Sequence, residues 1–139
     1  MSNGGVQQYK QLDVSGAVEA ASPHRLIQML MERALSNIGL ARNNMEREEV
    51  MAKGVHISQA IDIINGLQAS LNHKHDPKMS ANFDELYGYM MRRLLEANLH
   101  NDSAILDEVD GLLREIKEAW DAIADAPEAK SVQAEDNNG

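Results

Sequence analysis

The sequence predicts an all-α protein: an antiparallel up-down four-helix bundle with a mobile N-terminal arm and a disordered C-terminal tail. Apolar residues recur at steps of three and four in four successive segments, which is the spacing of one face of a helix. Aromatic residues make up only 4% of the chain, a composition that suits helices better than sheets. Short connections join the segments, so consecutive helices should run antiparallel.

The chain divides into three parts. We expect residues 1–20 to form a flexible N-terminal arm, residues 21–126 the four-helix domain, and residues 127–139 a disordered acidic tail. The tail has almost no large apolar side chain with which to offset the entropy of ordering. The arm is rich in glycine and polar residues, and its apolar anchors are Val6, Tyr9, Leu12 and Val14.

The first helix should begin at Ser22-Pro23 and run to about Met45. The serine hydroxyl can accept a free backbone N–H, and proline at the first helical position loses no hydrogen bond. One apolar stripe follows, made of Ile27, Leu30, Ala34, Ile38, Ala41 and Met45.

The second helix is expected from Val50 to Leu71, after a polar turn over residues 43–49. Its apolar positions form a stripe that is wider than a two-position seam. The main stripe is Ile57, Ile61, Ile64 and Leu71, with Ala60, Ile63 and Leu67 beside it.

The third helix is expected to start near Ser80, because Pro77 disfavours a helical conformation in the residue before it. It carries Phe83, Leu86, Tyr87, Met90, Leu94 and Ala97. A polar hinge over residues 98–102 follows, in which we interpret Asn98 and Asp102 as capping residues.

The fourth helix shows the most regular periodicity in the chain, and Pro127 should close it. Its apolar positions are Ile105, Val109, Leu112, Ile116, Ala119, Trp120 and Ile123.

Composition excludes several classes of function. The chain has no cysteine, so it has no disulfide and no thiolate chemistry. A formal net charge of −9 argues against nucleic-acid binding, which needs a concentrated basic surface. No segment has the apolar length of a membrane span or a secretory signal. We therefore expect a soluble protein, with no insertion into membranes.

The sequence carries no motif for catalysis and predicts no cofactor. A di-iron centre in a helical bundle needs Glu-x-x-His pairs, and none occurs. Glu96 and His100 could share a helix face, and His73 and His75 could catch a metal ion, but solvated surface residues explain both better. A metalloenzyme is therefore a weak rival hypothesis.

The third segment has more apolar residues than one core stripe needs. From Tyr89 to Leu95 it reads YMMRRLL, with large apolar groups on more than one face of the helix. The methionines of the chain either fill gaps in the core or line a surface for a flexible partner. Met91 is the one least easily explained by the core.

Three stretches of the sequence resemble those of a known family. Residues 86–102 read LYGYMMRRLLEANLHND, which resembles the signature LYxYMxRRLxxANxxND of the FliS family of flagellar export chaperones. ASPHRLIQML at residues 21–30 and ILDEV at residues 105–109 agree in order and spacing. The resemblance covers residues 9 to 123. Met31 and Arg33 depart from it, since tyrosine and glycine are frequent there.

The resemblance implies a non-catalytic chaperone of the bacterial cytosol that wraps the disordered C-terminal segment of flagellin around the bundle. Such a chaperone prevents premature polymerisation and assists delivery to the export apparatus, whose gate would provide a further partner. It also implies that the arm covers part of the client surface, so that Tyr9, Leu12 and Val14 form a displaceable strap. A disordered client can supply amphipathic helices for apolar grooves.

Positions off the main stripe of each helix are our candidates for client contact, although packing between helices explains them equally well. With the strap, the predicted partner-binding residues are Tyr9, Leu12, Val14, Ile63, Leu67, Tyr87, Met91 and Leu95. The alternative is a regulatory or scaffold bundle that binds a folded partner. The sequence leaves open whether the chain is a monomer or a dimer.

Overall fold

Residues 21–74 and 76–123 are described by the computed structural model of the chain. Within them lie four helices, which are α3 (Pro23–Glu46), α4 (Val50–Ala69), α5 (Pro77–His100) and α6 (Ser103–Ile123). The predictions about the arm, including Tyr9, Leu12 and Val14, lie outside the described residues. The same is true of the predictions about Pro127 and the tail.

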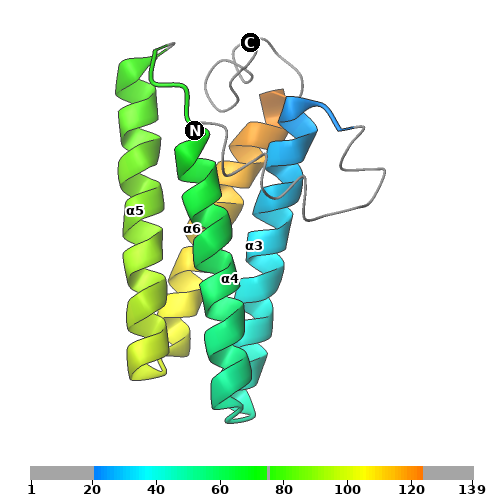
Figure 1. The fold of residues 1–139 in the computed structure, drawn as a ribbon, viewed down its shortest axis with the longest axis vertical. Helices are drawn as coiled ribbons and strands as arrows, with labels where there is room; N and C mark the ends of the chain where they lie inside the picture. Colours follow the sequence, from blue (N-terminus) through cyan, green and yellow to red (C-terminus); the bar gives the residue numbers. More distant parts are fainter. Residues whose placement is uncertain (1–20, 75, 124–139) are drawn as a thin grey trace.

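The four helices pack side by side as an antiparallel bundle, which confirms the predicted fold class (Figure 1). Each helix packs against two neighbours, in the cyclic order α3, α4, α5, α6. In Figure 1, α4 stands in front between α5 and α3, and α6 passes behind. The helix α4 therefore has an α3-facing flank and an α5-facing flank.

The helix α3 begins and ends close to the positions predicted from the sequence. The Ser22 hydroxyl accepts the backbone N–H of Arg25 at 3.1 Å, and Pro23 occupies the first helical turn. All six apolar residues predicted for its stripe are buried. The helix ends at a tight turn in which Glu48 has a φ of 58°.

The helix α5 begins three residues earlier than predicted. Asp76 caps it by accepting the backbone N–H of Met79 at 3.1 Å, and Pro77 takes the first helical position. Pro77 is therefore the first residue of this helix, whereas the sequence pattern predicted it in the loop before the helix. At the other end, α5 continues to His100, and Asn101 is its C-cap with a left-handed backbone at φ 54°.

This geometry corrects one capping assignment. Asn98 lies inside α5, so its interpretation as a cap was wrong, and Asn101 ends the helix instead. Asp102 was assigned correctly, because its carboxylate accepts the backbone N–H of Ala104 at 3.0 Å as α6 begins. The hinge is therefore only two residues long, which places the start of α6 directly beside the end of α5.

The core is a single cluster contributed by all four helices. The apolar face of α6 differs from the prediction in that Leu106 and Leu113 are buried, whereas Leu112 is partly buried and Ala119 is exposed. The start of α3 is tied to the end of α6 by a reciprocal contact. His24 Nε2 lies 2.8 Å from the Trp120 carbonyl oxygen, and the indole N–H of Trp120 donates to the His24 carbonyl at 3.0 Å.

The two rings of this contact also stack, with their centroids 4.6 Å apart. Since a carbonyl oxygen can only accept, Nε2 of His24 carries the proton in this arrangement. The stacked pair therefore closes the α3–α6 end of the bundle with both polar groups satisfied.

Candidate partner-binding surface

Large apolar side chains are exposed at several places on the bundle. They are Leu40, Val50, Met51, Val55, Met79, Leu95 and Leu99. Leu95 and Leu99 are 59% and 78% exposed and lie one turn apart on α5, while Val50 is 69% exposed at the start of α4. Contiguous exposed apolar groups mark interaction sites more often than single ones do.

The contacts between α4 and α5 show that these three side chains belong to one surface. Gln68 Nε2 donates to the Asp84 carbonyl at 3.1 Å near one end, and Lys53 Nζ donates to the Asn98 carbonyl at 3.1 Å near the other. The two helices are therefore antiparallel neighbours along most of their length. The first turns of α4 lie level with the last turns of α5.

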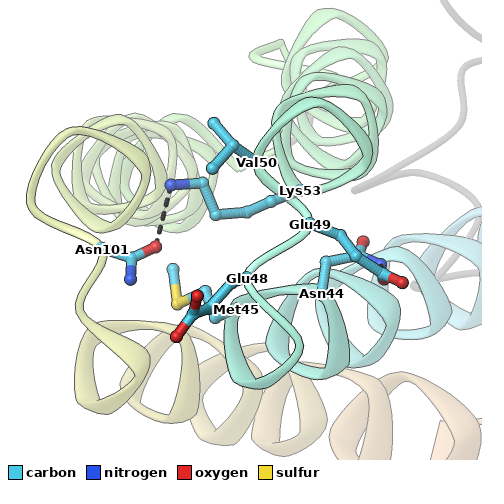
Figure 2. A pocket seen from close by; sticks show the side chains of 7 residues that line it. All are labelled: Asn44, Met45, Glu48, Glu49, Val50, Lys53 and Asn101. Atoms are coloured by element: carbon cyan, nitrogen blue, oxygen red, sulfur yellow. Dashed lines mark hydrogen bonds between the residues drawn. The ribbon is translucent and has the colours of Figure 1, made fainter.

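Helical register then identifies the flank of α5 that faces α4. A Cβ placed on Gly88 would lie 3.7 Å from Gln68 Nε2, so position 88 faces α4. Leu95 follows seven residues later, two turns along the same flank, and Leu99 follows after one further turn. On α4, Val50 projects toward α5 (Figure 2).

We define the α4–α5 face as the apolar residues of these two flanks. Ile61 and Met91 are partly buried and pack against the core, and they connect the exposed residues to it. The face consists of Val50, Ile61, Met91, Leu95 and Leu99. Its exposed members are Val50, Leu95 and Leu99.

The structure separates the predicted site residues into two groups. Met91 and Leu95 lie on the α4–α5 face, whereas Ile63, Leu67 and Tyr87 lie in the hydrophobic core. The assumption that these three lie off the buried stripe was wrong. The buried sector of α4 is broad because α3 and α5 pack against both of its flanks. A role of any of the five in partner binding stays a prediction.

Leu99 and Val50 were missed by reasoning from the sequence. Met91, Leu95 and Leu99 follow one another at steps of four, which is a second apolar stripe beside the core stripe of α5. That signal could have identified Leu99. Val50 offers no comparable signal, because it is the first residue of α4. At a helix end, the apolar periodicity of the sequence does not indicate which side of the helix a residue lies on.

A polar cluster joins the opposite flank of α5 to α6. The carboxylate of Glu108 accepts the Tyr89 hydroxyl at 2.5 Å and Arg93 Nε at 2.9 Å. The Tyr89 hydrogen bond, followed by that of Arg93, lowers the pKa of Glu108 below its ordinary value. Arg93 also pairs with Glu96, whereas Arg92 is exposed. Arg93 is therefore the pairing residue of the Arg92-Arg93 motif.

The residue before Glu108 ties α6 to its other neighbour. Asp107 accepts Nε and Nη2 of Arg42 at 2.7 and 2.9 Å, a two-pronged contact with α3. This hydrogen bonding lowers the pKa of Asp107. The Asp107-Glu108 pair therefore holds α6 against both of its neighbours and leaves the α4–α5 face free of these charges.

A pocket of about 340 Å³ lies at the end of the bundle beside Val50 (Figure 2). The side chain of Lys53 lines this pocket. The Lys53 ammonium donates to Asn101 Oδ1 at 2.9 Å and also to the Asn98 carbonyl. Lys53 is buried, so these hydrogen bonds offset the cost of removing its charge from water. The pocket is lined by Asn44, Met45, Glu48, Glu49, Val50, Lys53 and Asn101.

The described residues show no cluster of three or more potential metal ligands. The carboxylate of Glu96 pairs with Arg93, and His75 of the loop lies outside the described residues. None of the described helices combines the length and the apolar composition needed to cross a membrane.

Comparison with known proteins finds a matching family model and several similar chains. Residues 5–127 match the family model described as flagellar protein FliS. The flagellar secretion chaperone FliSB of Pseudomonas aeruginosa is 45% identical over 119 residues, covering 86% of this chain and 94% of the relative. The flagellar secretion chaperone FliS of Salmonella typhimurium is 48% identical over 121 residues, covering 86% and 90%. That of Bacillus subtilis is 35% identical over 104 residues, covering 75% and 77%.

Proposed function

Because the chain belongs to the FliS family of flagellar secretion chaperones, we propose that it binds the disordered C-terminal segment of flagellin and holds it for export. Membership of a chaperone family confirms the expectation that the chain is not an enzyme. The proposed client would be captured in the bacterial cytosol before it polymerises, and a component of the export gate would receive the complex.

The α4–α5 face is the observation that supports this proposal. Its exposed residues Val50, Leu95 and Leu99 present apolar surface to water although the core beneath them is closed. An amphipathic helix can cover such a surface with its own apolar face. A client that is disordered when free loses entropy on binding, so the complex can be specific and still release its cargo.

The test is calorimetry with a synthetic peptide of the flagellin C-terminal segment, combined with circular dichroism. We expect a dissociation constant on the order of micromolar or tighter and a gain of helix in the peptide. Leu95→Glu should weaken binding by about tenfold or more, because it places a charge in an apolar contact. Absence of peptide binding by the unaltered protein would contradict the proposal.

A matched control comes from α3. Leu40 is also an exposed leucine, but it does not belong to the α4–α5 face. Leu40→Glu adds the same charge to the bundle and should leave the peptide affinity unchanged. Equal loss of affinity in both variants would mean that net charge, and not the α4–α5 face, governs binding. If a folded protein is captured in place of flagellin, the scaffold alternative replaces this proposal.

A further inference from the structure

Several glycines lie inside helices without a reason within the bundle. Gly39, Gly54 and Gly111 have no heavy atom within 4 Å of the position that a Cβ would occupy, and none has a positive φ. Neither close packing nor backbone conformation therefore requires glycine at these positions. Glycine weakens the interior of a helix relative to alanine, because it loses more conformational freedom on folding.

The surroundings distinguish Gly54 from the other two. Residues three and four positions away on the same helix are its surface neighbours. Gly54 has Val50 and Met51 on its N-terminal side, and both are exposed large apolar residues. The corresponding neighbours of Gly39 are the buried Leu35 and the polar Ser36, Arg42 and Asn43, so none of them is an exposed large apolar residue. Those of Gly111 are charged, namely Asp107, Glu108, Arg114 and Glu115.

Gly54 also lies next to the exposed end of α5. It follows Val50 by one turn on the flank of α4 that faces α5. Its sequence neighbour Lys53 hydrogen bonds with the Asn98 carbonyl, which places Gly54 level with the turn of α5 between Leu95 and Leu99. By this register, the open position at Gly54 lies on the same face as the exposed Val50 of α4 and the exposed Leu95 and Leu99 of α5.

We propose that Gly54 is the floor of a hole on the α4–α5 face, and that this hole receives one large apolar side chain from the bound flagellin segment. The inference rests on the proposed function, and it adds the residue that selects the shape of the client. A side chain of a docked helix can enter a hole between residues of the facing helices, as in coiled-coil packing. A residue larger than glycine would fill the hole and hold the client helix away from Val50 and Leu95.

The experiment compares Gly54→Ala and Gly54→Leu with Gly39→Ala and Gly111→Ala. Thermal unfolding measures stability, and calorimetry with the flagellin C-terminal peptide measures affinity. All three alanine variants should raise the melting temperature, since alanine favours the helix in each case. Only the Gly54 variants should lose affinity, by about threefold for alanine and about tenfold or more for leucine.

This combination separates the hole from a general effect on the bundle. A variant that is more stable and yet binds more weakly cannot owe its weaker binding to unfolding. Unchanged or tighter binding by both Gly54 variants would overturn the inference, and so would equal losses in the Gly39 and Gly111 controls. If the unaltered protein binds and Leu95→Glu does not, while the Gly54 variants bind normally, only this inference fails. If the unaltered protein does not bind, the proposed function fails with it.

Discussion

At the scale of single residues, Glu108 shows how the polar positions of the signature act. Tyr89 and Arg93 lie four residues apart on α5, so both side chains reach the same carboxylate on α6. Of the two adjacent arginines of the signature, Arg93 is paired with Glu108, whereas Arg92 is exposed.

This contact makes stability depend on pH. The pKa of Glu108 is lowered in the folded state, so its contribution to stability is present above 4.5, its ordinary value, and is lost as the pH falls through the folded pKa. Glu108→Gln should therefore be less stable than the unaltered protein at pH 7, with a smaller difference at pH 3. Urea unfolding at both pH values, followed by circular dichroism, measures this change.

Glu115→Gln provides the control for the loss of one negative charge. Glu115 is exposed on the same helix, and its substitution should leave the pH dependence of unfolding unchanged. A constant difference between Glu108→Gln and the unaltered protein from pH 7 to pH 3 would contradict the assignment of this carboxylate.

At the scale of helices, the start of α5 shows how one proline can be interpreted in two ways. Pro77 disfavours helix in the residue before it, and it is also well suited to the first position of a new helix. Asp76 decides between these effects, because its side chain accepts a free backbone N–H of the first turn. The helix therefore begins at the proline, and Ser80 is buried in its first turn.

Asp76→Ala should lower the free energy of unfolding by about 1 kcal/mol, the usual cost of removing an N-cap. Asp76→Ser should recover most of this loss, because a hydroxyl oxygen can accept the same N–H. Urea unfolding monitored by circular dichroism measures both variants. Equal stability of the alanine and serine variants would show that the cap of α5 contributes nothing.

At the scale of the whole molecule, the bundle separates apolar residues that look alike in the sequence. Leu67 of α4 is fully buried and Leu95 of α5 is mostly exposed, although both were predicted to contact a partner. The folded bundle needs the first residue for its own stability. It does not need the second, which is therefore available to a client.

Leu67→Ala should reduce the free energy of unfolding by about 2–5 kcal/mol, because it leaves a cavity in the core. Leu95→Ala should change it by no more than about 0.5 kcal/mol, as expected for an exposed position. Thermal and urea unfolding of the two variants measure this contrast. A similar loss in both would mean that Leu95 supports the bundle and is not free for a partner.

The sequence by itself determined the four helices of the described residues, the residues of the α3 stripe and the family resemblance. These features are local, since helical periodicity and capping involve residues within a few positions of one another. The resemblance likewise depends on spacing along the chain.

Only the tertiary structure decided which flank of each helix is covered. Ile63, Leu67 and Tyr87 became core residues, while Val50 and Leu99 became exposed. The physical reason is that periodicity places a residue around the axis of its own helix, whereas burial depends on where the neighbouring helices stand. The α4–α5 face exists because α4 and α5 each expose one flank, and only their packing brings these flanks together.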